Sequence, residues 1–362
     1  MSKPLIDKSR IYPVVLLLIV FLVWKYRESQ KEKVEEAPII YNDKTYELIS
    51  FSGKTMGPII YSIKYYQENG VNHQAGVDSV LEVFNLSLNT YNPNSEISRF
   101  NRDTTFEFQL PYFHQVLARS KEISSLTGGA FDPTIGPFIN AWGFGAQKEI
   151  NPDSATIDSL KSFVGFSKIN FDEQRVWKQS PAVKIDFSAI AKGQGVDVVA
   201  DYLASKGIKN LFVEIGGEIV ARGLNLHTKE PWVAGIIDPT KADPGTGRPE
   251  LLGLVSLKNK AIATSGNYYN YRIIDSVRYS HTIDPASGFP IEHEILSASV
   301  FALDCMTADA FATAFMVTGH EKAIEIVEQN EGVDAYLVFS KPDGSVGTYA
   351  SPGIAQHIEN AK

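Results

Sequence analysis

Hydrophobic positions recur along this chain with two periods, one typical of strands and one typical of helices. Between residues 46 and 66 apolar and polar side chains alternate in two runs, which predicts two strands. The residues between the runs, Met56-Gly57-Pro58, predict a tight turn. The next apolar positions fall at helical spacing and predict an amphipathic helix. These positions are Val77, Val80, Leu81, Phe84 and Leu88.

The remaining pattern mixes both kinds of element without strict alternation. Such a mixture favours an α+β fold, with mixed sheets and packed helices, over a doubly wound parallel sheet. Further helices are expected at 111–126, 154–164, 196–203, 307–317 and 320–329. Further strands are expected at 183–185, 211–215, 219–222, 232–237, 252–257, 261–264 and 297–303, with hairpins within 168–178, 269–281 and 335–350. Residues 89–101 are expected to form a polar loop.

The N-terminal segment has a different pattern. Lys3, Lys8 and Arg10 precede an apolar run at 11–24, as in a secretory signal or a signal anchor. Neither a small-residue cleavage site nor a cysteine for lipid attachment follows, so an uncleaved anchor at 1–26 is the first interpretation and a cleaved signal peptide the second. A charged tether would then occupy 27–45, and the globular part 46–362 would be extracytoplasmic.

Composition narrows the classes of function. The 362 residues are 44% hydrophobic and 21% charged, with a formal net charge of −8, which fits a globular protein with a real core and argues against nucleic-acid binding. The single cysteine, Cys305, excludes an intramolecular disulfide and a cysteine-cluster metal site. The seven histidines are scattered, and no H-E-x-x-H is present, so zinc is not the expected metal.

The stretch from Val183 to Gly217 carries the densest candidate chemistry. A short strand, a turn with Ser188 as a possible N-cap, a helix and a second strand would bring Asp186, Lys192 and the final glycine pair to one rim. A helix N-terminus, a cation and glycines are suited to a phosphate-bearing ligand. No complete G-x-G-x-x-G or P-loop motif is present, so this stretch alone slightly favours an ordinary strand–turn–helix unit over a phosphate site.

Two polar side chains interrupt an otherwise apolar helix. Asp309 and Thr313 are four residues apart and therefore share one face of the helix expected at 307–317. A buried carboxylate is costly unless it is paired or binds a metal, and oxygen ligands of this type suit Mg²⁺. Asp309 could instead cap the helix start, but a cap would not explain Thr313.

Other polar groups lie in turns. Asp132, His281 and Asp284 each stand where an apolar element meets a turn, and aspartates there can simply cap the turn. His281 could be a base, a ligand contact or a bystander. The loop at 130–145 is rich in glycine, proline and aromatic residues, which predicts irregular structure packed against a planar ligand or beneath the core.

Five stretches in this chain resemble the ApbE-type FAD:protein FMN transferases, flavin transferases of the bacterial cell envelope. They occur in the order found in that family and lie between Met56 and Gly319. The stretches are Tyr91 to Asn101, Thr127 to Pro133, Asp186 to Gly193, His281 to Pro285, and Ala308 to Thr313.

The resemblance implies a fold and a reaction. The fold would be the family's mixed α/β fold, related to the T-fold, in one compact unit. FAD would be the donor, Mg²⁺ would bridge its diphosphate, AMP would leave, and FMN would be joined by a phosphoester to a Thr or Ser of an acceptor protein. The family expectation for the acceptor is a subunit of a membrane redox complex, with the enzyme on the periplasmic side of the inner membrane.

The resemblance also assigns residues by position. The metal ligands would be the backbone carbonyl of Ala189 with the side chains of Asp309 and Thr313. His281 would lie near the reacting phosphate, and either His281 or Asp284 would take the proton of the acceptor hydroxyl. Flavin or nucleotide contacts would come from Met56, Tyr91, Ala130, Phe131, Asp132, Asp186, Lys192 and Ile283.

Two other functions fit the same residues. An FAD pyrophosphatase would use the same metal site and give the FMN to water. A protein that only binds FAD would neither need the Asp309–Thr313 pair nor release AMP.

Overall fold

The computed structural model describes residues 38–145, 152–241, 250–267, 271–274, 277–291 and 294–360. The anchor expected at 1–26 lies outside these residues. Among the helices in the described part of the chain, none is both long and apolar enough to span a membrane. The first strand, β1, already pairs with β2 at Ile39–Tyr41, so the sheet begins within the segment expected to be a tether.

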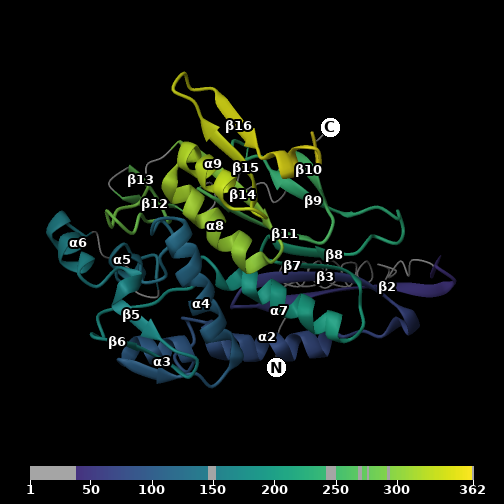
Figure 1. The fold of residues 1–362 in the computed structure, drawn as a ribbon, viewed down its shortest axis with the longest axis horizontal. Helices are drawn as coiled ribbons and strands as arrows, with labels where there is room; N and C mark the ends of the chain where they lie inside the picture. The colour runs from purple at the N-terminus through teal and green to yellow at the C-terminus, as the bar shows by residue number, and fades with distance from the viewer. Residues whose placement is uncertain are drawn as a thin grey trace, which may run out of the picture.

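A large antiparallel sheet forms the centre of the molecule (Figure 1). Its strand order is β1-β2-β3-β7-β8-β11-β14-β15-β16, so most neighbours in the sheet are also neighbours in sequence. The strands alternate in burial, as β7 does with every second residue inward. The bounds are β1 Ile39–Tyr41, β2 Lys44–Thr55, β3 Ile59–Gln67, β7 Asn210–Ile215, β8 Glu218–Arg222, β11 Lys260–Gly266, β14 Ile295–Ala302, β15 Asp334–Ser340 and β16 Val346–Ala350.

Helices cover one face of this sheet and enclose the main core. The most buried of them, α8, packs against β11, β14 and α7, and α7 packs in turn against β7 and α2. Figure 1 shows α2, α7 and α8 lying across the strands, with α4 beside α8. The bounds are α2 Gln74–Leu88, α3 Glu96–Arg102, α4 Pro111–Leu126, α7 Ala191–Ser205, α8 Cys305–Thr318 and α9 His320–Gln329.

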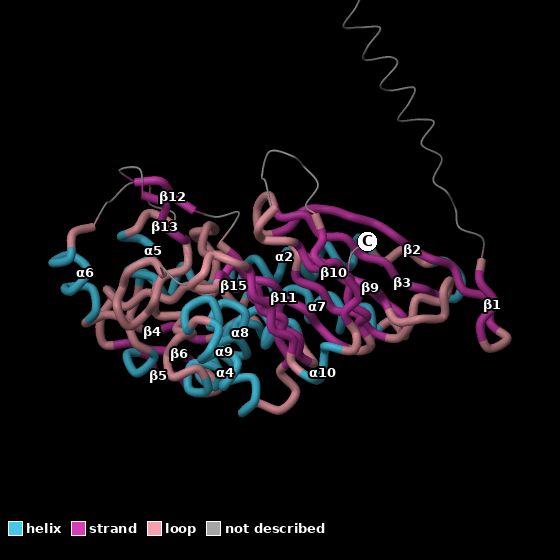
Figure 2. Tube along the Cα trace, turned by 90° about the horizontal axis from the view of Figure 1, so that it is seen from above, coloured by secondary structure: helices cyan, strands magenta, loops and turns pink. Residues whose placement is uncertain are grey.

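The opposite face carries a second core under a smaller sheet of β9, β10 and β17. The period of two in β11 separates the cores, because Ala261 and Ala263 enter the first and Ile262 the second. Figure 2, a view from above, shows β9 and β10 at the side of the main sheet near the C-terminus. The bounds are β9 Trp232–Ile237, β10 Leu251–Leu257, α10 Pro352–Ala355 and β17 Ile358–Asn360.

A third cluster lies at the far end of the molecule, around α5 (Gly136–Ala141) and α6 (Ser154–Lys161). Two small sheets lie at this end, β4-β6-β5 and the hairpin of β12 and β13 (Figures 1 and 2). Their bounds are β4 Thr105–Glu107, β5 Ile169–Phe171, β6 Arg175–Lys178, β12 Tyr271–Ile274 and β13 Val277–Ser280. Short 3-10 helices lie at Glu68–Gly70, after β3, and at Phe166–Lys168, before β5.

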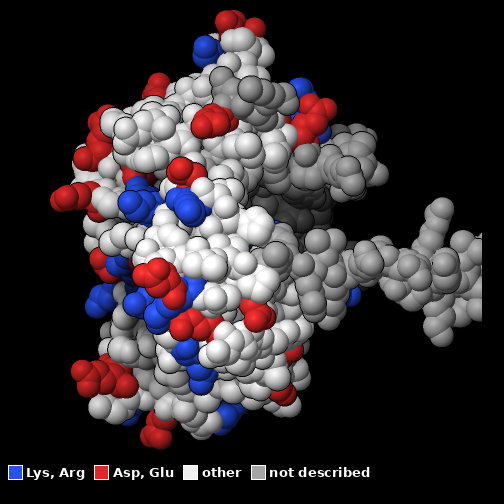
Figure 3. All heavy atoms as spheres, turned by 90° about the vertical axis from the view of Figure 1, so that its right-hand side faces the viewer, with Lys and Arg blue, Asp and Glu red and all other residues white. Residues whose placement is uncertain are grey.

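Charged side chains are mixed on the surface. On the face shown in Figure 3, acidic and basic groups alternate over short distances rather than forming a patch of one sign. The described residues of this face therefore form no extended patch of one charge sign.

The expected α+β class is observed, but two segments expected to be irregular contain helices. The polar loop at 89–101 contains α3, which begins because Ser95 caps it by accepting a hydrogen bond from the Ser98 amide at 3.2 Å. The glycine- and proline-rich loop contains α5, whose Phe138 is fully buried in the third cluster. Burial of its aromatic side chains outweighs the poor helix propensity of the segment.

The central strand–turn–helix unit also differs in detail. Val183 to Ile185 is extended but forms only one bridge, from Lys184 to Ile135, instead of a strand. Ser188 does not cap α7, which begins at Ala191 without a side-chain cap. The Ser188 amide instead donates to the Asp186 carboxylate at 2.7 Å, so the side chain of Asp186 stabilises the turn.

The helices α7 and α8 approach each other unusually closely at Gly193. A Cβ at this position would collide with the carbonyl of Cys305 and would lie 2.8 Å from Cβ of Asp309. Hydrogen bonds between the two helices reinforce this contact. Asp197 of α7 accepts hydrogen bonds from the first amides of α8, those of Cys305 and Met306, each at 2.8 Å. Glycine is therefore required at 193 for close backbone approach.

We expect Gly193→Ala to lower the free energy of unfolding by about 1–3 kcal/mol, because the added methyl group forces the two helices apart. Gly195→Ala is the matched control, since its Cβ would approach closely only the flexible end of the Met56 side chain, at 2.7 Å, while Phe84 and Ile215 would lie at the ordinary contact distances of 3.6 and 3.8 Å. Both substitutions gain similar helix propensity. Urea unfolding curves that give equal stabilities for the two variants would contradict the close-approach argument.

Candidate functional site

One large cavity collects the polar groups singled out in the sequence. Its volume is about 820 Å³, and it opens between the helical face of the main sheet and the loops around α5. That size suits a ligand larger than a mononucleotide. The residues expected at flavin, nucleotide, phosphate or metal that line it are Met56, Tyr91, Ala130, Phe131, Asp132, Asp186, Ala189, Lys192, His281, Ile283, Asp309 and Thr313.

Asp309 is held inside the cavity wall by α8 and α7 together. The carboxylate is buried, and its Oδ2 accepts a hydrogen bond from the Gly193 amide at 2.9 Å. Burial raises the pKa of Asp309, and the positive charge of Lys192 counteracts this effect. The helix is capped by Asp304, which accepts from the Thr307 amide at 2.8 Å. Asp309 is therefore not the cap, and the capping alternative is excluded.

Thr313 lies one turn further along the same face of α8. Its hydroxyl is 3.2 Å from the Ser265 hydroxyl at the end of β11. Both residues line the cavity with Asp309, so a carboxylate and two hydroxyls are presented along one wall.

A partly exposed lysine, Lys192, and a buried carboxylate, Glu218, form an ion pair at the base of the same wall. Lys192 is the second residue of α7, and Glu218 is the first residue of β8, directly after the Gly216-Gly217 turn. The ammonium donates to Oε1 of Glu218. Burial lowers the pKa of Lys192, but the charges of Glu218 and Asp309 outweigh it and raise the pKa above its ordinary value. Lys192 therefore stays protonated across the physiological range.

The segment that carries Asp186 and Ala189 is fixed by side-chain and backbone contacts. Asn101 donates to the carbonyl of Ile185 and accepts from its amide, each at 2.8 Å, and so imitates a neighbouring strand. The amide of Asp186 donates to the carbonyl of Pro133 at 2.7 Å. These bonds bring the segment against the loop that begins at Ala130.

Asp132 organises that loop. Its Oδ1 accepts from the amide of Thr134 at 2.8 Å and from its hydroxyl at 2.6 Å, and the same hydroxyl accepts from the Gly165 amide at 2.6 Å. Burial raises the pKa of Asp132, while the bonds from Thr134 lower it. Asp132 therefore has one oxygen committed to the loop while its side chain lies at the cavity.

Two residues border the cavity, one in the turn between β2 and β3 and one shortly after the end of α2. Met56 occupies the turn between β2 and β3 with a φ of 48°, a left-handed conformation that is unusual for methionine. Tyr91 follows α2 and is 70% exposed. A strained apolar residue and an exposed aromatic ring at one rim are suited to a planar ligand.

His281 follows β13 and lines the cavity. Its loop is fixed by two bonds, from Trp142 Nε1 to the carbonyl of Gly288 at 2.8 Å and from the Ile291 amide to the carbonyl of Thr282 at 3.0 Å. Asp284 has a different place. Its carboxylate accepts from the amides of Ala286 and Ser287, at 2.9 and 3.2 Å, and it is not among the cavity-lining residues. The structure thus gives Asp284 a turn-capping role.

Glu218, which lines the cavity, and Asn101, which holds the Ile185 segment beside it, were not identified as site residues from the sequence. Glu218 follows the glycine pair that ends a strand, and this position could have drawn attention to it. Asn101 closes the Tyr91 to Asn101 stretch, but no spacing rule places it beside Ile185, which is far away in sequence.

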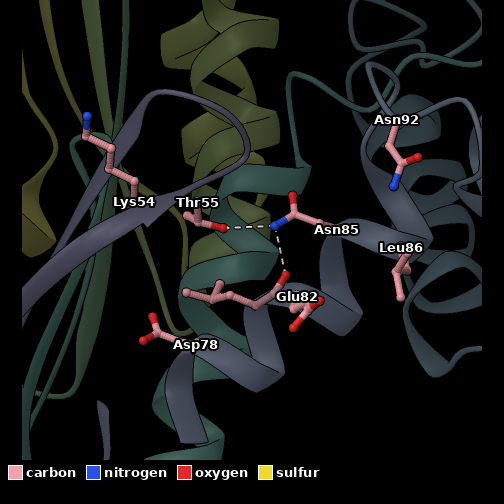
Figure 4. Close-up of a pocket in the computed structure, with 8 residues that line it drawn as sticks. Lys54, Thr55, Asp78, Glu82, Asn85, Leu86 and Asn92 are labelled. Atoms are coloured by element: carbon pink, nitrogen blue, oxygen red, sulfur yellow. Dashed lines mark hydrogen bonds between the residues drawn. The ribbon is translucent and has the colours of Figure 1, made fainter. Parts of the chain in front are cut away.

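A second hollow, of about 390 Å³, lies outside this wall between β2 and α2 (Figure 4). Figure 4 shows the Asn85 amide directed at Thr55, and the bond between them is 3.0 Å long. Asp78 is likewise bound by the Tyr61 hydroxyl at 2.5 Å. These polar groups are satisfied internally, so the hollow gives no independent sign of a ligand.

The oxygen groups in the large cavity fit a hard divalent cation. Within the described ranges, no three His, Cys, Asp or Glu side chains cluster as metal ligands. A cation would therefore combine Asp309 and Thr313 with the Ala189 carbonyl and with oxygens of the ligand, as Mg²⁺ commonly does. The buried Oε2 of Glu218 has no hydrogen-bond partner among the described residues, although Lys192 pairs with the other oxygen of the same carboxylate.

Comparisons with known proteins identify the family of this chain. A sequence model of the ApbE family matches residues 56–337. The FAD:protein FMN transferase of Vibrio cholerae is 39% identical over 85% of this chain and 92% of its own length, and that of Haemophilus influenzae is 37% identical over 84% and 90%. Two solved structures are similar: flavin transferase ApbE from Vibrio cholerae (TM-score 0.76, 37% identity, 86% of this chain and 99% of that one) and the apo flavinyl transferase ApbE from Pseudomonas stutzeri (TM-score 0.74, 30%, 86% and 97%).

We expect Asn101→Ala to destabilise the protein by about 2–3 kcal/mol, because the amide and carbonyl of Ile185 both lose their partner. The Asp186 segment would loosen as well, so FAD affinity, measured by flavin fluorescence, should fall. Asn94→Ala, an exposed position in the same loop, is the control. Unchanged stability and FAD binding in Asn101→Ala would show that Asn101 does not hold the segment.

Proposed function

The chain belongs to the ApbE family and is an enzyme, a flavin transferase, and from this premise we propose that it moves FMN from FAD to a Thr or Ser side chain of an acceptor protein. The proposed reaction depends on Mg²⁺, forms a phosphoester and releases AMP. The observation that carries the proposal is the shared cavity. Every residue expected to contact flavin, nucleotide or metal lines that single space, although these residues come from six separate parts of the chain.

Charge complementarity supports FAD as the donor. The diphosphate would lie at the N-terminus of α7, where the helix dipole and the Lys192 ammonium offer positive charge. Asp309, Thr313 and the Ala189 carbonyl would hold Mg²⁺. When bound, Mg²⁺ supplies charge neutralisation for the phosphates. Met56 and Tyr91 at the rim would bracket the planar flavin.

The transfer itself requires positioning more than covalent chemistry from the protein. The acceptor hydroxyl oxygen forms a bond to the FMN phosphorus, and the bond from that phosphorus to the bridging oxygen breaks, so AMP leaves with that oxygen. We assign the hydroxyl proton to His281, which lines the cavity. Asp284 is less suited to this role because both of its oxygens accept backbone hydrogen bonds. Lys192 would balance the negative charge on the leaving phosphate.

The cellular setting of the proposal follows from the N-terminal sequence. The basic residues before the apolar run at 11–24 support attachment to the bacterial inner membrane, with residues 46–362 on the periplasmic side. The acceptor we propose is a subunit of a membrane redox complex that carries a flavinylation Thr or Ser.

The test is a direct transfer assay with the full-length chain. The protein is incubated with FAD, Mg²⁺ and an acceptor fragment that carries a candidate Thr, and the fragment is analysed by mass and in-gel fluorescence. We expect an FMN-sized mass gain, equimolar AMP, and loss of both with EDTA. AMP and free FMN with an unmodified fragment would favour a pyrophosphatase, and FAD retained uncut would favour a binding protein.

Asp309→Asn should reduce AMP release by at least about a hundredfold, since it removes the charge that would hold the cation. Asp343→Asn, in the exposed turn between β15 and β16, is the control and should react like the unchanged protein. AMP release at the unchanged rate in Asp309→Asn would refute the metal assignment.

A further inference from the structure

Glu218 is a buried carboxylate with one oxygen left over. The residue is 2% exposed, its Oε1 pairs with Lys192, and its Oε2 has no hydrogen-bond partner in the described part of the chain. A buried carboxylate that is only half satisfied is costly. This cost indicates that the charge of Glu218 has a role beyond its pairing with Lys192.

The position of Glu218 in the fold places it beside the reacting groups. Gly216, with a φ of 60°, turns β7 into β8 so that Glu218 faces the cavity. A Cβ at 216 would lie 3.7 Å from Oε2 of Glu218 and 2.8 Å from Cγ2 of Ile59. Any side chain at 216 would therefore collide with Ile59 beside the carboxylate.

Three charges meet at this wall: the partly exposed Lys192 ammonium and the buried carboxylates of Glu218 and Asp309. Both carboxylates act on the ammonium, and Glu218 has the larger effect. Asp309 lies next to Lys192 through the bond from the Gly193 amide to its Oδ2. Without Glu218, Asp309 would be the nearest remaining counter-charge for the lysine.

We propose that Glu218 is a positioning residue for Lys192. Glu218 holds the Lys192 ammonium away from Asp309 and so leaves the Asp309 carboxylate free to bind a divalent cation. This inference rests on the proposed metal site. With Glu218 present, the three groups carry one net negative charge. Without Glu218 they carry none, because Lys192 would pair with Asp309. An entering cation would then meet an Asp309 carboxylate that is already paired with the lysine.

The test measures cation binding rather than turnover. The dissociation constant of Mn²⁺ is determined for the full-length chain from the EPR signal of the free ion. Affinity for FAD without metal is measured separately by flavin fluorescence. The variants are Glu218→Gln, Lys192→Met, the double variant and Asp309→Asn, with Glu214→Gln as the matched control, because Glu214 lies on the adjacent strand and outside the cavity lining.

We expect Glu218→Gln to weaken Mn²⁺ binding by about tenfold or more, as the added net charge beside the cation requires. The double variant restores the original net charge, so it should recover Mn²⁺ binding to within about threefold of the unchanged protein. Metal-free FAD binding should not weaken in Glu218→Gln, since Lys192 remains, and Glu214→Gln should change neither constant.

Other outcomes separate the possible errors. If Asp309→Asn binds Mn²⁺ as well as the unchanged protein, the proposed metal site itself is wrong. If Asp309→Asn loses Mn²⁺ but Glu218→Gln does not, the metal site stands and the role of Glu218 is wrong. If the double variant is as defective as Glu218→Gln, or if Glu218→Gln loses FAD and Mn²⁺ together, Glu218 supports the fold and does not position Lys192.

Discussion

The close contact of α7 with α8 is the constraint on which the site depends. Gly193 lets the two backbones approach, and the bond from its amide to Asp309 fixes the carboxylate at the point of contact. Asp197 closes the contact in the other direction by accepting from the first amides of α8. Because the two helices cap and anchor each other, Lys192 and Asp309 are held by one rigid unit on the main sheet.

This unit explains how the core tolerates several charges. Burial alone raises the pKa of Asp309 and Glu218 and would favour their neutral forms. Lys192 opposes this effect for both carboxylates. The remaining negative charge is what a bound divalent cation would balance, so the same arrangement that is costly for the free protein is suited to a phosphate ligand that arrives with a metal.

Local sequence pattern predicted much of the fold, for reasons visible in particular elements. The helix α8 and the hairpin of β15 and β16 lie where they were expected, because apolar side chains dominate α8 and recur at inward positions along β15. The segments that differed, α3 and α5, are short helices made by capping and by burial in a cluster from distant parts of the chain. Short elements of this kind have little periodic signal, so tertiary packing decides them.

For the site, the sequence by itself determined which chemistry is available: Asp309 and Thr313 on one helical face, Lys192 at a helix start, and motifs in the order of one family. Only the tertiary structure decided which groups act together. It brought Glu218 to Lys192 and Asn101 to Ile185, and it turned the Asp284 carboxylate toward its own loop. The reason is physical, since helical spacing is set by the local backbone, whereas a contact between distant segments depends on sheet register and helix packing.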